Sequence, residues 1–523
     1  MRVLFVLQYP GYTRYFDSLM RVLLDRGHTL ALAYDKPHKQ AEGNEALAGM
    51  QIEMLAEVPV ARGVFWSVVG LGVRGTIDYV RYLDPRFADS PYLRDRMRIA
   101  LPSVVRGLGK YDTLSTWKTN LLLSMLHVCE RAIPSSPTIE RFLQRARPDL
   151  VVVSPLVTDS STQVDIFKSA QALGIPAALC VASWDHLTTK GLMRIKPDLV
   201  TVWNEHQRDE AAAYHRVERE RVAVTGAAPF DRWFGRTPSR DREAFCRLVG
   251  LPSDRPFILF VGSTKSISRP DAETAFVRHW VTELRAELDQ RKLKVSILIR
   301  PHPFNSAHWA QADLGGLENA AIFPRHEANP VNEADRADYF DSLYHSEAVV
   351  GINTSAMIEA AIVGRTVHTL LDPAFSGTQE GTLHFRYLLP ENGGFLKVAH
   401  GMDEHVQQLA DTLDDPAAGA KQLDTFVRKF VRPHGLTTAA TPLQADALEG
   451  LVMRGRPRPR GVPIALYPLS GVLFLAGLVA AYRPTGSTRK AVKNLRKFWR
   501  NTKRSALGKA RALLGRSANP DQP

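Results

Sequence analysis

The chain has 523 residues, of which 45% are hydrophobic and 23% are charged, as expected for a globular protein of two or three domains. Its three cysteines, Cys129, Cys180 and Cys246, are too few and too scattered for a disulfide framework or a zinc site. The net charge of +13 is uneven, because residues 452–516 contain 16 Lys and Arg and no acid. The rest of the chain, without Asp521, has 51 basic and 53 acidic residues, which does not indicate a nucleic-acid-binding body.

Strand and helix patterns alternate over residues 1–235. The apolar run RVLFVL predicts a first strand, since about six residues are too few for the ~7–15 of a secretory leader. An amphipathic helix over 15–27 and a strand over 29–35 complete a βαβ unit. Residues 60–130 interrupt the alternation with mixed apolar and basic segments of helical character. We therefore predict an N-terminal Rossmann-like domain over 1–235, with a helical insert at about 60–130, in the cytoplasm.

A polar hinge over 235–256 precedes a second strand–helix series, which begins with FILFV and closes with a helix around MDEHVQQLADTL. This series predicts a C-terminal Rossmann-like domain over 251–445. The fold class is then α/β, with two Rossmann-like domains that face each other across a cleft. Ligands of such sheets bind at the carboxyl ends of the strands, so we expect the site in that cleft.

The stretch VSILIRPHPF places an Arg and a His at the end of a buried strand. Pro301 and Pro303 restrict the backbone on both sides of His302, and Arg300 adds a cation one pleat away. A phosphate-bearing ligand would use both side chains. The alternative interpretation is a capping His on a rigid turn.

A second strand-end signal is VVGINTSAMIEAAIVGR. The residues Asn353, Thr354 and Ser355 suit a helix start, where free amides and hydroxyls can bind an anion. Glu359 follows on the same helix and is placed to reach a sugar hydroxyl or simply to favour the helix start. An ordinary capped connection between a strand and a helix, without a ligand, would have the same sequence pattern.

Together, RPHP and the NTS element about fifty residues later resemble the donor-binding half of GT-B glycosyltransferases. The resemblance implies that 1–235 is an acceptor domain and 251–445 a nucleotide-donor domain. The likeness extends over about 140–445 and is greatest to CDP-glycerol glycerophosphotransferases and bacterial polysialyltransferases. It implies that His302 matches a His-Pro motif, and Thr354 and Ser355 a hydroxyl motif, that hold the donor nucleotide and its phosphates. The acidic general-base motif of polysialyltransferases is not visible.

Two further stretches agree with this resemblance. VTGAAPFDRWF is similar to the end of a GT-B N-terminal domain, and FVGSTKS to the first strand and loop of a C-terminal domain. The resemblance places Ser263, Thr264 and Lys265 on the cleft. After the strand VHTLL, the polar stretch 371–389 contains four candidate donor or acceptor contacts: Thr378, Gln379, Thr382 and His384.

The general base is predicted from polar loops of the first domain, because transfer to a hydroxyl requires a group that accepts its proton. Asp185 in CVASWDHLTTKG is the favoured candidate, with His186 beside it and Asp159 after VVVSPLVT as further candidates. Asp185 as a helix N-cap is the alternative. The sequence shows no Asp-x-Asp pair, so we expect neither a metal nor a cofactor; a nucleotide-sugar or a CDP-glycerol-like donor would be a substrate.

The C-terminal region joins an apolar and a basic segment. After a Pro/Arg linker over 446–462, the 19 residues 464–482 contain no charge and as a helix would reach about 28 Å, close to the ~30 Å of a bilayer core. The acid-free basic stretch that follows suits an anionic membrane surface. We expect 463–523 to attach the protein to the cytoplasmic face of a membrane, as a span, a re-entrant segment or an interfacial helix; a core helix is the alternative.

The leading hypothesis is a membrane-associated, metal-independent GT-B glycosyltransferase. It would move a sugar or a glycerol-phosphate unit from a nucleotide-activated donor to a lipid-linked or polysaccharide acceptor of the cell envelope. The second hypothesis is an enzyme similar to UDP-N-acetylglucosamine 2-epimerases, and the third is a non-catalytic scaffold of the same shape. Product analysis without an acceptor separates the first two, and failure to bind any nucleotide-sugar favours the third.

Overall fold

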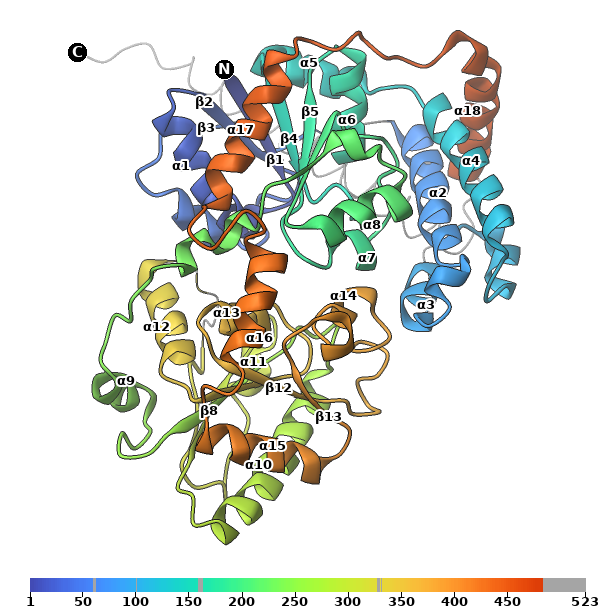
Figure 1. The fold of residues 1–523 in the computed structure, drawn as a ribbon. Coiled ribbons are helices and arrows are strands. Elements are labelled where there is room, and N and C mark those ends of the chain that lie inside the picture. Colours follow the sequence, from blue (N-terminus) through green and yellow to red (C-terminus); the bar gives the residue numbers. More distant parts are fainter. Residues whose placement is uncertain (60–62, 100, 159–162, 327–329, 331, 483–523) are drawn as a thin grey trace, which may run out of the picture.

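The computed structural model describes residues 1–59, 63–99, 101–158, 163–326, 330 and 332–482. Two parallel β-sheets, each covered by helices, form two domains that lie one above the other in Figure 1. This arrangement confirms the α/β fold of two Rossmann-like domains, the GT-B fold, expected from the sequence.

The sheet of the first domain has seven strands in the described residues, all parallel. In spatial order they are β3 (Ile52–Met54), β2 (Thr29–Tyr34), β1 (Arg2–Leu7), β4 (Leu150–Ser154), β5 (Ala177–Cys180), β6 (Leu199–Val202) and β7 (Val222–Val224). In the central strand β1, Val3 and Phe5 join the hydrophobic cluster on one face of the sheet, whereas Leu4 and Val6 join that on the other. Burial on both faces explains why these strands read as continuous apolar runs.

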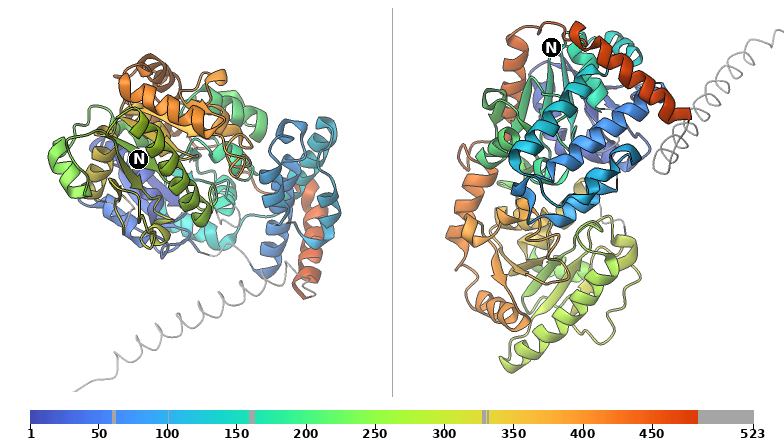
Figure 2. Two further views of the ribbon diagram at one scale, coloured as in Figure 1. Left: turned by 90° about the horizontal axis from the view of Figure 1, so that it is seen from below. Right: turned by 90° about the vertical axis from the view of Figure 1, so that its right-hand side faces the viewer.

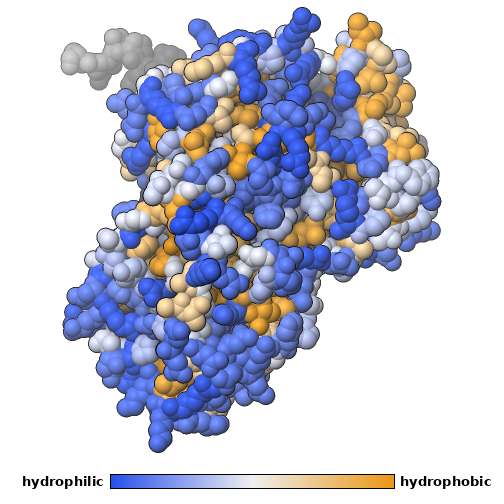
Figure 3. Space-filling model, viewed as in Figure 1, coloured by the Kyte–Doolittle hydropathy of each residue, from blue (hydrophilic) through white to orange (hydrophobic). Residues whose placement is uncertain are grey.

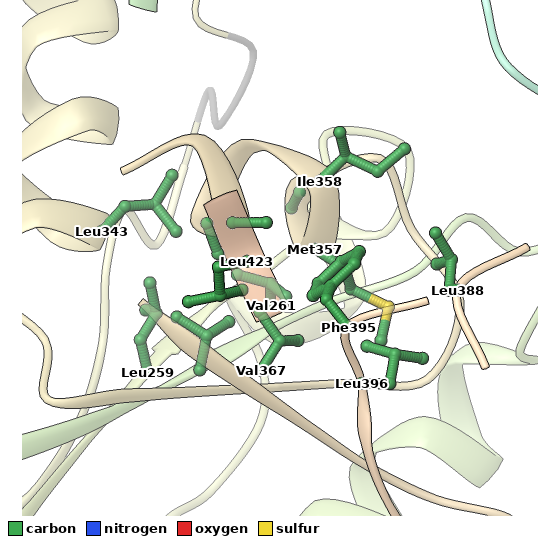
Figure 4. Close-up of a cluster of buried hydrophobic side chains, with 14 of the residues drawn as sticks. Leu259, Val261, Leu343, Met357, Ile358, Val367, Leu388, Phe395, Leu396 and Leu423 are labelled. Atoms are coloured by element: carbon green, nitrogen blue, oxygen red, sulfur yellow. The ribbon is translucent and has the colours of Figure 1, made fainter. Parts of the chain in front are cut away.

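The sheet of the second domain has six parallel strands among the described residues. Their order is β10 (Ala320–Ile322), β9 (Ser296–Arg300), β8 (Phe257–Val261), β11 (Ala348–Gly351), β12 (Thr366–Leu370) and β13 (Lys397–Ala399). Leu259 and Val261 of β8 pack with Met357, Val367 and other apolar side chains in the cluster shown in Figure 4. The edge strands β3 and β13, which have three residues each, were not expected from the sequence.

Helices cover the faces of both sheets. Those of the first domain are α1 (Asp17–Asp25), α5 (Pro137–Ala146), α6 (Gln163–Ala172), α7 (His186–Thr189) and α8 (Glu205–His215). Those of the second domain are α9 (Arg242–Val249), α10 (Pro270–Gln290), α11 (Ser306–Trp309), α12 (Glu333–Tyr344), α13 (Ala356–Ile362), α14 (Leu383–Arg386), α15 (Met402–Asp414) and α16 (Ala420–Phe426).

Helix α17 (Ala440–Met453) returns from the second domain to the first. Its residues Ala445, Leu448 and Leu451 pack into the cluster beneath the first sheet, and Gln444 Nε2 donates to Thr201 Oγ1 at 2.8 Å. Figure 1 shows α17 beside α1. The chain therefore passes between the domains twice. The range predicted for the second domain, 251–445, includes the first residues of α17, which packs on the first domain.

A separate helical bundle lies at one side of the first domain (Figure 2). The insert supplies α2 (Val64–Arg81), α3 (Pro91–Arg98) and α4 (Thr116–Ala132), and the C-terminal region supplies α18 (Tyr467–Tyr482). The ring of Phe474 in α18 lies 5.8 Å from the rings of both Phe65 and Trp66 in α2. The apolar helix expected from the sequence is present, and one of its faces packs on the insert.

Candidate active site in the interdomain cleft

A cavity of about 640 Å³ lies between the two sheets. The first domain lines it with the loops after β1 and β5, and the second with the loops after β8, β9 and β11. All five loops leave the carboxyl ends of parallel strands, where sheets of this class bind ligands. The cavity therefore lies where the strand order predicts a site.

His302 lines the cavity as a neutral imidazole. The backbone N–H of Phe304 donates to Nδ1 of His302 at 3.1 Å, so the proton of the neutral ring is on Nε2. Burial, together with the charge of Arg14, lowers the pKa of His302 to about 3. At neutral pH this side chain therefore offers an N–H donor to a ligand, beside the positive charge of Arg300.

Arg300 lines the cavity, but its side chain is largely buried and is held by its own domain. Its guanidinium donates to Ser342 Oγ at 2.8 Å and lies 4.8 Å from the ring centre of Tyr339. Burial lowers the pKa of Arg300 to about 10, which leaves it charged at neutral pH. Arg300 thus contributes a fixed positive charge to the cavity, with part of its donor capacity already used.

The turn Asn353–Ser355 meets the first domain directly. Trp184 Nε1 donates to Ser355 Oγ at 3.1 Å, and the Trp184 ring lies edge-on to His384 at 4.6 Å. Asn353, Thr354 and Ser355 all line the cavity, and the amide of the largely buried Asn353 donates to Thr378 O at 2.5 Å. Helix α13 has only seven residues, so a phosphate here would depend mainly on the surrounding side chains.

Glu359 lies on α13 with its carboxylate toward the cavity. Tyr339 donates a hydrogen bond to it, and burial raises the pKa of Glu359 to about 7, against the effects of Tyr339 and Arg14. This carboxyl group therefore changes protonation near neutral pH and can accept from, or donate to, a ligand hydroxyl.

The remaining donor-site candidates divide into two groups. Thr264 and Lys265 line the cavity. Ser263, Thr378 and Gln379 do not belong to the cavity lining in the described structure: all three are buried and hold loops in place. Ser263 O accepts from Asn305 Nδ2 at 2.7 Å, and Gln379 Nε2 donates to backbone oxygens of β12 and the end of β11. We correct their expected role from ligand contact to loop support.

Asp185 is held in a network within its own loop. Its oxygens accept from Ser183 Oγ at 2.6 Å and Thr189 Oγ1 at 2.9 Å, and Lys190 Nζ lies 3.4 Å away. Although burial alone would raise it, the pKa of Asp185 is well below its usual range because of Lys190 and nearby histidines. Because its oxygens already accept hydrogen bonds from Ser183 and Thr189, Asp185 is better suited to fixing this loop.

His186 follows Asp185 and lines the same wall of the cavity. Its ring stacks on Tyr12 at 6.2 Å, and its buried Nδ1 has no hydrogen-bond partner among the described residues. Burial lowers the pKa of His186 to about 4, against the charge of Asp185, so the ring is neutral at pH 7 and has a lone pair for a proton. The third candidate, Asp159, lies outside the described residues.

The cavity is strongly cationic. The described residues that line it include nine Arg and Lys but only two acids, Asp185 and Glu359. Six of these cations were not identified from the sequence: Arg14, Lys39, Arg96, Arg232, Arg236 and Arg336. Arg14 lies in the loop QYPGYTRY directly after β1, so the strand-end argument that identified His302 would have found it too.

Two of the lysines come from opposite domains. The pKa of Lys39 in the first domain is lowered, first by burial and then by the charges of Lys36 and of Lys265 in the second domain. The ammonium of Lys39 lies 4.0 Å from the ring centre of Tyr9. Repulsion between cations across the cleft is relieved when an anion lies between them.

No group of three or more His, Cys, Asp and Glu that would suit a metal ion occurs in the described part of the chain.

Comparisons with known proteins show a similarity in fold at low identity. No family model and no curated protein matches the chain. Among solved structures, a glycosyltransferase from Rickettsia africae is 10% identical with a TM-score of 0.49, over 87% of this chain and 99% of that one. A UDP-GlcNAc 2-epimerase from Neisseria meningitidis, bound to UDP-GlcNAc, is 10% identical with a TM-score of 0.48, over 86% and 100%. The wall teichoic acid polymerase TagF is 10% identical with a TM-score of 0.42, over 87% and 89%.

Each of these three proteins corresponds to a family named from the sequence alone: glycosyltransferases, UDP-GlcNAc 2-epimerases and, for TagF, CDP-glycerol glycerophosphotransferases. Identities of 10% and TM-scores below 0.5 assign none of these activities to this chain.

Proposed function

We propose that this protein is a GT-B-type transferase that moves a sugar or a glycerol-phosphate unit from a nucleotide-activated donor to a hydroxyl of a lipid-linked or polysaccharide acceptor at a membrane. The observation that carries the proposal is the cationic cavity between the two sheets, with nine Arg and Lys against two acids. A donor phosphate chain is the kind of ligand that such a charge distribution favours.

In this proposal the second domain holds the donor. Nε2–H of His302 and the hydroxyls of Thr354 and Ser355 donate to phosphate oxygens, while Arg300 and Lys265 supply charge. Transfer breaks the bond between the moving unit and a phosphate oxygen, on which negative charge then develops. Fixed donors and cations stabilise that charge without reorganising, which is the largest contribution to catalysis in many enzymes.

The acceptor approaches from the first domain, where His186 takes the proton of its hydroxyl. A neutral imidazole accepts this proton as the new bond forms, and the adjacent charge of Asp185 stabilises the resulting imidazolium. Asp185 keeps the loop rigid through Ser183 and Thr189. This assignment favours His186 over Asp185, the residue first predicted from the sequence.

The proposal is tested first by donor binding. Thermal-shift screening with UDP-, GDP-, CDP- and CMP-linked donors should identify at least one that stabilises the protein. His302→Ala should abolish most of that shift, whereas His400→Ala, which changes an exposed histidine away from the cavity, should not. If no donor stabilises the protein, a non-catalytic scaffold becomes the better account.

The products then separate transfer from epimerisation. A transferase should consume the donor only when a suitable acceptor is present and should release the nucleotide. An epimerase would convert a nucleotide-sugar without any acceptor, so conversion of the donor alone would contradict the proposed transfer.

A further inference from the structure

Helix α4 of the insert carries an apolar stripe that the body does not cover. Trp117, Leu121, Met125 and Val128 are spaced along one face of the helix and are 64%, 54%, 59% and 41% exposed. Four large apolar side chains in helical register, all exposed, differ from the scattered single residues common on protein surfaces. The stripe therefore requires an explanation of its own.

The other faces of α4 are already in contact with the protein. Leu123 packs in a cluster with Ile77 and Val80 of α2. On a second edge, Asn120 and Ser124 accept hydrogen bonds from Arg216, at the end of α8. The stripe thus lies away from the packing of Leu123, is bordered on one edge by the contacts of Arg216, and is not part of the core of the insert.

Helix α18 continues this apolar surface. It packs against both α2 and α4. Gly477 lies so close to α2 that a Cβ at this position would be 2.7 Å from the backbone oxygen of Phe65. The opposite face of α18 exposes Val472, Leu475 and Val479, each by about 60%. In Figure 3, orange side chains gather at the upper right, where α18 lies in Figure 1.

We infer that the outer faces of α4 and α18 together form one membrane-docking surface, which lies flat in the headgroup region of an anionic bilayer while α18 stays packed on α2. This surface differs from the anchor expected from the sequence, because half of it belongs to the insert. For α18 to cross the bilayer, it would have to leave Phe65, Trp66 and α4, and the stripe on α4 would remain in water.

The length and composition of α18 suit a membrane span as well as an interfacial helix. Residues 464–481 are the single stretch in the described residues that is long and apolar enough to span, judged by length and composition. The packing of α18 on α2, rather than its length, is therefore what favours an interfacial position.

Charge favours a lipid surface over a second copy of this chain. The linker before α18 contains Arg454, Arg456, Arg458 and Arg460, and residues 483–516 contain 12 Lys and Arg and no acid. Every copy of this chain has the same excess of positive charge, so charge opposes the pairing of two copies, whereas an anionic bilayer attracts a cation near its surface by about 1 kcal/mol.

The test is flotation of the full-length protein with vesicles made of equal parts phosphatidylcholine and phosphatidylglycerol. The triple variant Trp117→Ser, Leu121→Ser, Met125→Ser should weaken vesicle binding at least about tenfold, because burial of apolar area contributes to such binding. A second triple variant on α18, Val472→Ser, Leu475→Ser, Val479→Ser, should do the same. Leu248→Ser, which removes an exposed apolar side chain of α9, should bind like the wild type.

Two results would overturn the inference. The first is unchanged vesicle binding by a folded α4 variant, because the C-terminal region alone would then be the anchor. The second is a dimer of the wild-type chain without vesicles that either triple variant dissociates, because the surface would then join two copies. Neither measurement uses donor or acceptor, so the outcome does not depend on the reaction proposed for the cleft.

Discussion

His302 should bind the donor through a neutral N–H group, and this can be tested by replacing each ring nitrogen separately. Gln places an amide N–H near the position of Nε2, whereas Asn keeps an acceptor near the position of Nδ1 for the backbone N–H of Phe304. His302→Gln should therefore retain most of the donor affinity, and His302→Asn should lose it to the same extent as His302→Ala.

The magnitude follows from the interaction removed. A hydrogen bond to a charged group contributes roughly 1.5–3 kcal/mol, so the donor Kd of His302→Ala should rise about 10- to 150-fold. Burial and Arg14 keep the pKa of His302 at about 3, so its protonation is constant over the neutral range. The ratio of the wild-type and His302→Ala affinities should then be flat from about pH 5 to about pH 8, around the ordinary His pKa of ~6.5.

Isothermal titration calorimetry with the donor identified by screening measures both affinities. Protonation of the donor phosphates affects both proteins equally, so it cancels in the ratio. A ratio that falls as the pH rises through the ordinary His range would refute the reasoning, because it would show that an imidazolium binds the phosphate. Equal losses of donor affinity in the Gln and Asn variants would also refute it, because a hydrogen-bond donor at the position of Nε2 would then not contribute to donor binding.

Three further predictions concern ionisable side chains. Lys265→Met should weaken donor binding about tenfold, with a loss that shrinks at high salt; a loss independent of salt would contradict a role as a cation. His186→Gln should lower transfer about 10²-fold at unchanged donor affinity and more than Asp185→Asn does; the reverse order would make Asp185 the base. Burial raises the pKa of Glu210 to about 8 in the native state. The native state therefore binds this proton more tightly than the unfolded chain does, and the free energy of unfolding falls as the pH rises from about 5 through 8. Glu210→Gln should therefore raise the thermal midpoint above pH 8 by about 2–4 °C, and the exposed control Glu220→Gln should leave it unchanged.

The strands and their ends could be predicted from the sequence. Parallel strands buried on both faces must be apolar throughout, so runs such as RVLFVL and FILFV mark them without knowledge of their partners. Ligand sites of such sheets follow the strands directly, which is why the sequence alone points to His302, Thr354 and Lys265. The short edge strands β3 and β13 were missed because three residues give too little pattern.

The protonation states and free donors of the site depended on the tertiary structure. Only the fold shows that Phe304 fixes the tautomer of His302, that Ser342 and Tyr339 enclose Arg300, and that Asp185 is held by its own loop. Burial and neighbouring charges set these properties, and both are sums over residues distant in the sequence.

The association of distant segments was likewise decided by tertiary packing. The uncharged stretch of 19 residues is enough to predict that α18 is apolar. The same composition, however, suits a membrane span, an interfacial helix or a core helix. The position of α18 on α2 depends on the fit of Phe474 between Phe65 and Trp66, a contact between residues about 400 positions apart. Composition sets the free energy gained when a segment is removed from water, whereas shape complementarity with a distant partner decides which surface the segment packs against.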